Sequence, residues 1–290
     1  MSSIENIKTS KMVRDEGLDK FYTIPVVVDM CISSLSKIYK WEDWDLVVEP
    51  SAGNGSFLHK IPSFNKIGID INPEHVDIIQ QDFFDYKPPI NKNKIMVIGN
   101  PPFGKNSSVA IKFFNHSSQW AEVIAFIIPR TFRRISVQNK LDMSFHLIID
   151  EEIPVSPCSF TPPMMVKCCF QVWEKKNVKR EIIKLQTQHN DWDFLSFGPK
   201  DEKNQPTPPE NADFAIRAYG GKCGEIIIDN LEILRPKSWH WIKCKTIKKE
   251  TMISIFNKLD YSNSKNTARQ NSLGRGELVN LYCNFIDSKM

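Results

Sequence analysis

Short apolar runs alternate with polar or amphipathic stretches between residues 46 and 173, and this alternation limits the fold more than any other feature of the chain. Buried parallel strands form continuous apolar runs, and the stretches between them supply the crossover connections. The pattern therefore predicts an α/β domain on a largely parallel sheet. Strands are expected at 46–49, 66–71, 95–99, 123–128, 145–150 and 166–173, with a further short strand near 81–84.

The segment that precedes the first predicted strand, Pro25 to Ile38, has apolar residues at helical spacing and opens with a proline. Proline favours the first turn of a helix, because its nitrogen has no hydrogen that needs an acceptor there. We expect this helix to pack on the sheet.

The pattern changes after Trp173, where a charged run is followed by the proline-rich loop PKDEKNQPTPPEN. Such a change predicts a domain boundary, with a first domain at 1–173 and a second at 174–290. The second is expected to be a smaller α+β domain. We predict two strands around a Gly-rich turn within 212–229, a strand at 238–245 and a helix at 246–261.

The boundary also divides the charge of the chain. The whole chain has 38 basic and 34 acidic residues, a net charge of +4. Residues 1–173 contain 18 basic and 19 acidic residues, a net charge of −1. Residues 174–290 contain 20 basic and 15 acidic residues, a net charge of +5. A mildly basic second domain is compatible with nucleic-acid binding, although a solvated Lys-rich face is the commoner explanation.

The composition, 41% hydrophobic and 25% charged, is that of a soluble globular protein and excludes disorder or a coiled coil. No apolar stretch approaches the length of a membrane helix, and the first residues, MSSIENIKTSKMVRDEG, lack the apolar part of a signal peptide. The seven cysteines form no C-x-x-C pair, so neither a zinc site nor a disulfide framework is indicated. We therefore expect a cytoplasmic protein in a reducing compartment.

The segment EPSAGNGSF, from Glu49 to Phe57, follows the first predicted strand and precedes an expected helix. Its glycines allow a tight turn and a close approach of the backbone to a ligand. It lacks the third glycine of the dinucleotide fingerprint and the Lys-Ser/Thr of a P-loop. On spacing alone, an ordinary strand-to-helix turn explains it equally well.

The next predicted strand ends at Asp70, where an acid is placed to accept hydrogen bonds from ribose hydroxyls. A cap for a helix that begins near Pro73 is the structural alternative. Together with the glycine loop, Asp70 favours an adenosine-containing cofactor. Asp82 and Phe83 would then hold the adenine by a hydrogen bond and a stack.

Asn100-Pro101-Pro102-Phe103 follows the strand at 95–99, at the carboxyl edge where open α/β sheets bind ligands. The four residues offer a side-chain oxygen, a proline carbonyl and an aromatic ring. These groups can hold a planar amine, with two acceptors for its N–H groups and a face for stacking. The motif predicts chemistry at an amino group.

EPSAGNGSF, Asp70, QDFF and NPPFG, in this order and preceded by FYTIP at 21–25, resemble the motif series of the AdoMet-dependent N6-adenine methyltransferases. The likeness covers roughly residues 20 to 175. It implies a class I methyltransferase fold, Rossmann-like, with seven strands of which the last is antiparallel, and S-adenosyl-L-methionine (AdoMet) as cofactor. The order of the segments is similar to that of the group whose target-recognition domain is C-terminal.

The resemblance also implies roles for individual residues. The side chain of Asn100 and the carbonyl of Pro101 would accept the hydrogens of an adenine amino group, and Phe103 would stack on the base. The implied catalytic residues are Asn100, Pro101, Pro102 and Phe103. The implied cofactor-binding residues are Tyr22, Thr23, Glu49, Pro50, Ser51, Ala52, Gly53, Asn54, Gly55, Asp70, Ile71, Asp82, Phe83 and Asn100.

Basic residues after the predicted strands are candidates for phosphate contacts, with a solvated helix start as the alternative. In the second domain, glycine-flanked turns permit close approach to a backbone, and structural turns explain them nearly as well. The candidate substrate-binding residues are Lys105, Arg130, Arg133, Arg134, Arg217 and Ser272.

These features predict an AdoMet-dependent methyltransferase acting on the N6 amino group of adenine in DNA. The alternatives are the same chemistry on RNA, an inactive nucleic-acid-binding subunit, and methylation of a protein glutamine. The expected partner is nucleic acid, DNA before RNA, without a membrane. A second domain of only 117 residues has little room to read a long site by itself, so a homodimer or a short target is compatible with the sequence.

Overall fold

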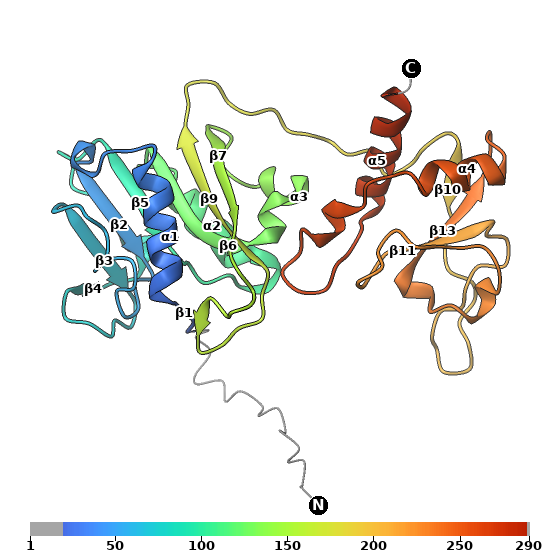
Figure 1. Cartoon of the computed structure of the whole chain (residues 1–290), viewed down its shortest axis with the longest axis horizontal. Coiled ribbons are helices and arrows are strands. Elements are labelled where there is room, and N and C mark those ends of the chain that lie inside the picture. Colours follow the sequence, from blue (N-terminus) through green and yellow to red (C-terminus); the bar gives the residue numbers. More distant parts are fainter. Residues whose placement is uncertain (1–19, 289–290) are drawn as a thin grey trace, which may run out of the picture.

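The computed structural model describes residues 20–288, which form two bodies that lie side by side (Figure 1). The segment on which the absence of a signal peptide was predicted, residues 1–17, lies outside the described residues. In the part of the chain that is described, no helix has the length and apolar character needed to cross a membrane.

Seven strands form the central sheet of the first body, in the order β4-β3-β2-β5-β6-β9-β7. Only β9 runs antiparallel to its neighbours, β6 and β7. A seven-stranded, mostly parallel sheet whose last strand is antiparallel is the class I methyltransferase fold, so the predicted fold class is confirmed. The strands are β2 Leu46–Pro50, β3 Lys66–Asp70, β4 Ile78–Gln80, β5 Ile95–Gly99, β6 Val123–Pro129, β7 Phe145–Glu152 and β9 Cys168–Lys175.

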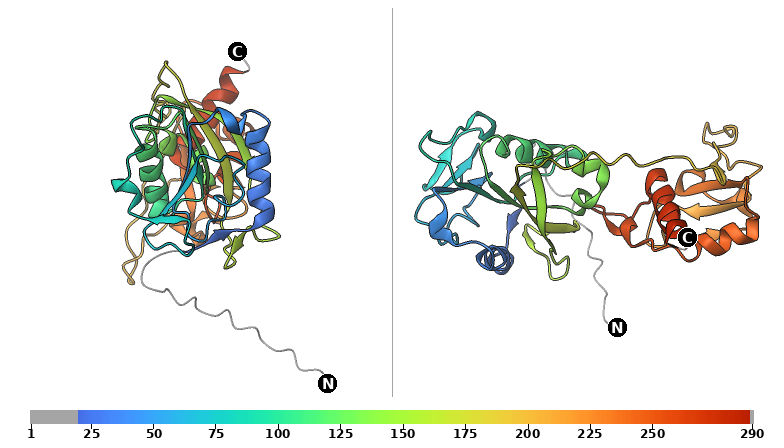
Figure 2. Two further views of the ribbon diagram at one scale, coloured as in Figure 1. Left: turned by 90° about the vertical axis from the view of Figure 1, so that its left-hand side faces the viewer. Right: turned by 90° about the horizontal axis from the view of Figure 1, so that it is seen from above.

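Successive side chains of the central strands point into two separate cores, because side chains alternate along a strand. Val47 and Met96 belong to the core that packs against α1 (Pro25–Ser36). Val48 and Val97 belong to the core that packs against α2 (Ser108–Ser117). Figure 2 shows α1 and α2 on opposite faces of the sheet. A sheet covered on both faces explains why its strands are continuous apolar runs.

Two local predictions were wrong, and one structural alternative does not apply. The strand expected at 81–84 lies earlier, as β4, and residues 83–85 form a 3-10 turn. The helix expected after the glycine loop is absent, because residues 51–60 form consecutive turns. No helix begins near Pro73, so Asp70 does not cap one.

Shorter elements complete the first body. A two-residue strand, β1 (Tyr22–Thr23), pairs antiparallel with β8 (Phe160–Thr161). α3 covers Ile135–Gln138. The 3-10 turns of this body are Trp41–Asp43, Phe83–Asp85, Lys105–Ser107 and Arg130–Arg133.

The second body has an antiparallel sheet in the order β10-β13-β11-β12, with its own aromatic core under two helices. The predicted strands and helix are present, whereas β10 and the last helix, α5, were not predicted. The elements are β10 Trp192–Phe194, β11 Phe214–Arg217, β12 Ile226–Ile227, β13 Trp239–Cys244, α4 Lys249–Phe256 and α5 Arg275–Asp287, with 3-10 turns at Leu231–Ile233, Pro236–Ser238 and Ser262–Lys265.

The segment at 266–273 joins the two bodies. The backbone N–H of Lys167 donates to the carbonyl of Ala268, and the guanidinium of Arg134 donates to the carbonyls of Asn266 and Ser272. On its other side, Leu273 N–H donates to the carbonyl of Ala218 in the second body. We call residues 266–273, which lie between the two bodies, the strap.

Candidate active site

A cavity of about 310 Å³ lies at the carboxyl ends of β2, β3 and β5. Its walls come from segments that are far apart in the sequence, including the first described residues and the loop before β9. The lining residues are Lys20, Phe21, Tyr22, Ser51, Gly53, Ile69, Asp70, Ile71, Asn72, Gln81, Asp82, Phe83, Phe84, Asn100, Pro101, Pro102, Phe103, Phe113 and Met164.

The glycine loop turns sharply at the mouth of β2. Ser51, Gly53 and Gly55 all have positive φ, at 53°, 54° and 79°. A Cβ on Gly53 would lie 2.6 Å from the ring of Tyr22, so only glycine allows this ring to lie against the loop. Ser51 and Gly53 line the cavity, whereas the predicted cofactor residues Pro50, Ala52, Asn54 and Gly55 belong to the loop but not to the lining.

Asp70 fixes the glycine loop to the end of β3. One carboxylate oxygen accepts the N–H of Gly53 at 2.8 Å, and the other accepts the N–H of Asn72 at 2.8 Å. Each oxygen retains a further lone pair, and Asp70 with the adjacent Ile71 lines the cavity. The structure thus gives Asp70 a positioning role that sequence reasoning did not include.

Tyr22 is held in place by Glu74, a residue that the sequence did not single out. The phenol donates to the Glu74 carboxylate, which Lys20 also contacts at 3.0 Å, and Glu74 N–H donates to the carbonyl of Gly53 at 2.9 Å. These bonds to Tyr22 and Lys20 lower the pKa of Glu74. The neighbouring Thr23 is buried, with no hydrogen-bond partner for its hydroxyl among the described residues.

Glu49 lies beneath the loop and does not line the cavity. Its carboxyl group is buried and accepts the backbone N–H groups of Phe57 and Leu58 at 3.2 and 2.6 Å. Burial raises the pKa of Glu49 to about 8, while the two backbone donors oppose this rise. Glu49 is therefore placed to shape the turn rather than to touch a ligand.

The DFF segment forms the apolar side of the cavity. Asp82 accepts the N–H of Phe84 at 2.9 Å, which holds the 3-10 turn. Phe83 is buried and stacks on Phe113, with ring centroids 5.1 Å apart. Phe84 is the exposed ring of the pair, and it meets Phe113 edge to face at 5.0 Å. Phe84 and Phe113 thus offer aromatic surface that the sequence assigned to Phe83 alone.

Asn100 stands at the end of β5, opposite the N-terminal segment. Its side-chain NH₂ donates to the carbonyl of Phe21 at 3.1 Å. The side-chain oxygen is then the atom that remains to accept a hydrogen bond from a ligand. Pro101, Pro102 and Phe103 continue along the same wall.

The predicted phosphate-binding residues are not in this cavity, and most have partners within the protein. Arg133 pairs with Asp150 and Glu152, Arg130 also pairs with Glu152, and Arg217 pairs with Glu225. Arg134 and Ser272 bind one another across the strap. Lys105 is exposed on the loop after NPPF. The structure thus gives these arginines intramolecular partners, which sequence reasoning did not foresee.

Eight residues of the lining were not among the predicted site residues: Lys20, Phe21, Ile69, Asn72, Gln81, Phe84, Phe113 and Met164. Gln81 and Phe84 flank the predicted Asp82-Phe83 pair, so the sequence motif around that pair could have indicated them. Phe113 on α2 and Met164 before β9 carry no motif, and only the fold brings them to the cavity.

No protein-family model matches the sequence, and no curated protein matches it. Solved structures do resemble its fold. The 23S rRNA methyltransferase ErmE aligns with 55% of this chain and 71% of its own, at 13% identity and a TM-score of 0.42. A Pyrococcus horikoshii protein proposed to be an RNA methyltransferase aligns with 55% and 88%, at 16% identity and 0.41. The magnesium protoporphyrin IX methyltransferase of Synechocystis aligns with 52% and 79%, at 11% identity and 0.40. Likenesses at this level carry no information about the substrate of this chain.

Proposed function

We propose that this chain is an AdoMet-dependent methyltransferase that transfers a methyl group to the exocyclic N6 amino group of adenine in DNA. The observation that carries the proposal is that one cavity is lined both by Asn100, Pro101 and Phe103 and by Asp70 and Phe84. A single cavity thus has one part suited to an adenosine and another suited to a planar amine.

The cavity fits AdoMet by its size and by its chemistry. About 310 Å³ is at the lower end of the range for small-molecule sites. Asp70 and Asp82 supply acceptors for hydroxyl and amino hydrogens, and Phe84 with Phe113 supplies surface for a purine. The absence of a Cβ at Gly53 lets the backbone lie close to a ligand.

AdoMet supplies an electrophilic methyl group on a sulfonium when it is bound. The remaining work belongs to the protein. Asp70 and the turn at Gly53 fix the position of the cofactor, since the two are hydrogen-bonded to each other at 2.8 Å. Positioning of two reactants contributes a large part of the rate of such a bimolecular step.

Asn100 prepares the acceptor amine. An adenine amino nitrogen is a weak nucleophile, because its lone pair is delocalised into the ring. Hydrogen bonds from its two N–H groups to the Asn100 side-chain oxygen and the Pro101 carbonyl favour a pyramidal nitrogen and stabilise the charge that develops on it. Phe103 supplies a face for the base, which must leave a duplex to reach the cavity.

A cluster of cations at the domain junction supports a nucleic-acid acceptor. We name Lys167, Lys265 and Arg269 the basic seam. Among the described residues none of the three forms an ion pair within 4.0 Å. Lys167 donates to the side-chain oxygen of Asn271 at 2.7 Å, and it lies three residues from Met164 of the cavity. Burial first, and then the charges of Arg130 and Arg134, lower the pKa of Lys167. Lys265 also lowers the pKa of the exposed Asp260, after the hydrogen bonds from Ser262. Gathered cations with few acidic partners are the charge pattern that phosphates neutralise.

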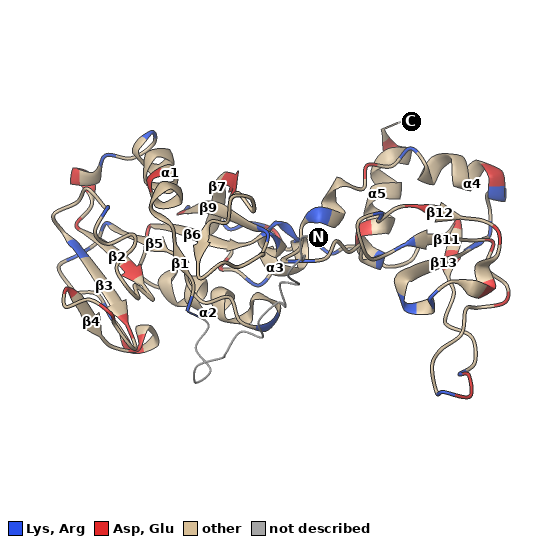
Figure 3. Ribbon diagram, turned by 60° about the horizontal axis from the view of Figure 1, so that its bottom comes forward, with Lys and Arg blue, Asp and Glu red and all other residues tan. Residues whose placement is uncertain are grey.

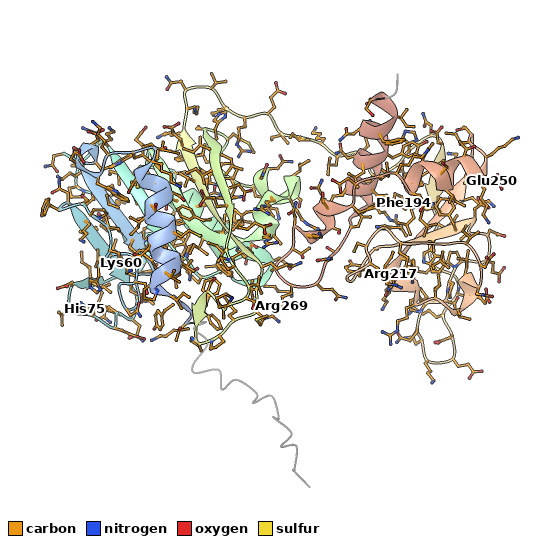
Figure 4. All side chains as sticks on the ribbon, viewed as in Figure 1. Lys60, His75, Phe194, Arg217, Glu250 and Arg269 are labelled. Carbon is orange, nitrogen blue, oxygen red and sulfur yellow. The ribbon has the colours of Figure 1, made fainter. Side chains whose placement is uncertain are left out.

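The seam leads from the first domain toward the second. Figure 3 shows basic residues gathered where α3 and the start of α5 meet, and Figure 4 shows Arg269 at the junction and Arg217 farther into the second domain. A polymer whose flipped base lies in the cavity would therefore have phosphates near both domains.

The proposed function is tested by incubating the full chain with labelled AdoMet and, in separate reactions, duplex DNA, single-stranded DNA, total RNA and a protein extract. Digestion of the labelled product identifies the methylated base or residue. We expect N6-methyladenine in DNA, and no label with the Asn100→Ala variant. Label in RNA adenine alone would replace DNA by RNA, and label in protein alone would overturn a nucleic-acid acceptor.

A further inference from the structure

A group of metal-ligating side chains lies outside the cavity, on the two loops that form its outer wall. His59 follows the glycine loop, and His75 and Asp77 lie on the loop between β3 and β4. Figure 4 shows His75 at this end of the sheet, far from the second domain. Each of the three side chains can offer one ligand atom, and these atoms all lie within 4.8 Å of one another.

The distances suit one small cation once the side chains adjust, because an ion on His75 Nδ1 would replace the hydrogen bond that this atom accepts from Asp77 N–H at 3.3 Å. His75 Nδ1 lies 3.4 Å and His59 Nε2 3.8 Å from the same oxygen of Asp77. Ligand atoms on a tetrahedral zinc ion are about 3.4 Å apart, given bonds near 2.1 Å. All three residues are exposed, so rotation of the rings is unhindered on the solvent side and an ion can enter.

The position of His59 is defined by the backbone below it. Gly55 has a φ of 79°, and a Cβ there would lie 2.5 Å from the His59 ring. The His59 and His75 rings meet edge to face, with centroids 4.4 Å apart. The rings therefore already face one another without an ion, which reduces the entropy lost when one binds.

A second His-x-Asp pair in the chain shows what the third residue adds. Asp191 N–H donates to His189 Nδ1 at 3.1 Å, as Asp77 N–H donates to His75 Nδ1 at 3.3 Å. This local turn is thus a structural motif of the chain. Only the pair at 75–77 has another histidine beside it among the described residues. His59 converts the turn into a set of three ligands.

We propose that His59, His75 and Asp77 bind one divalent transition-metal ion of the zinc class and so clamp the glycine loop to the loop after β3. Two imidazoles and one carboxylate suit zinc, with a fourth position open to water. The clamp would act on the cavity through Glu74, which is adjacent to His75 and donates its N–H to the carbonyl of Gly53. The ion site does not depend on the proposed function, whereas the effect of the ion on AdoMet binding rests on the proposed function.

The ion site is tested by calorimetric titration of the full chain with Zn²⁺, and by the spectrum with Co²⁺, which separates imidazole and carboxylate ligands from thiolates. We expect one site without a thiolate charge-transfer band, abolished in His59→Gln and in His75→Gln. The matched control is His189→Gln, which keeps the site. No binding by the unaltered chain, or equal binding by His75→Gln, would overturn the ion site.

The clamp is tested by measuring AdoMet affinity with and without Zn²⁺. We expect affinity to rise about fivefold or more with the ion, and Zn²⁺ affinity to rise by the same factor with AdoMet, because coupling is reciprocal. His75→Gln should remove both effects. The clamp would be overturned if Zn²⁺ and AdoMet both bind and neither changes the affinity for the other. If the chain binds the ion but binds no AdoMet, the proposed function is overturned and the ion site is confirmed.

Discussion

The side-chain NH₂ of Asn100 donates to the carbonyl oxygen of Phe21, 3.1 Å away and 79 positions earlier in the chain. This bond turns the amide so that its oxygen is the free atom in the cavity. A short N-terminal segment thus sets the orientation of the residue on which the proposed amine chemistry depends.

Replacement of Asn100 is expected to remove catalysis and leave cofactor binding intact. Asn100→Ala deletes the acceptor for one amine hydrogen, and the loss of one such hydrogen bond lowers the rate about 10²- to 10³-fold. Initial rates of methyl transfer and the Kd for AdoMet measure the two properties separately. Normal transfer by Asn100→Ala would contradict the role assigned to the side chain.

Replacement of Gly53 is expected to weaken AdoMet binding. An alanine would place a Cβ 2.6 Å from the Tyr22 ring at a φ of 54°, and this left-handed conformation alone costs about 1 to 2 kcal/mol. We expect Kd to rise about 10-fold or more. Gly221→Ala is the matched control, because a Cβ there meets nothing within 4 Å. Equal Kd values for both variants would argue against the close packing of Tyr22 on the loop.

The buried carboxyl of Glu49 is expected to make stability depend on pH. Its pKa is about 8 in the folded chain against an ordinary value of 4.5, so the native state binds the extra proton between these values. The free energy of unfolding should therefore fall as pH rises from about 5 to 8, with a slope approaching 1.4 kcal/mol per pH unit. Denaturant unfolding at a series of pH values, for the unaltered chain and for Glu49→Gln, measures this change in the free energy of unfolding. The variant should lack this slope, and parallel profiles would disprove the assignment.

Arg134 is expected to hold the two domains together. It donates to two carbonyls and one hydroxyl of the strap and lies 3.4 Å from Glu277 on α5. Arg134→Ala leaves these acceptors unpaired, which should cost about 2 to 4 kcal/mol. Limited proteolysis between the domains reports the effect. Arg235→Ala, at an exposed position, should be cleaved no faster than the unaltered chain; equal rates for Arg134→Ala would refute this role.

The basic seam is expected to bind phosphates. Lys265→Glu with Arg269→Glu changes two exposed cations and should weaken oligonucleotide binding while AdoMet binding persists. The plot of log K against log salt should become shallower by about one unit for each lost phosphate contact. Lys203→Glu with Lys258→Glu, an equal change of charge on exposed positions away from the strap, is the control. Equal affinity and salt slope for both double variants would exclude the seam as a contact surface.

Local pattern was sufficient for the central strands of the first body and for the order of the motifs. The runs at 46–49, 95–99 and 123–128 correspond closely to β2, β5 and β6, because a strand buried on both faces is almost continuously apolar, and Glu49 is the only charged side chain in these runs. The short connections were harder to predict. The turns at 51–60 are held by hydrogen bonds from Gly53 N–H to Asp70 and from Phe57 N–H to Glu49, and β4 is held by its pairing with β3.

The sequence by itself determined that an acid and a glycine loop meet an Asn-Pro-Pro-Phe turn at one edge of a parallel sheet, because strand order and chain direction place them there. Only the tertiary structure decided which atoms face the cavity. Asn100 is oriented by Phe21, Phe84 and Phe113 share the aromatic wall, and His59 meets His75, because side-chain contacts between separate loops depend on packing that no local pattern encodes.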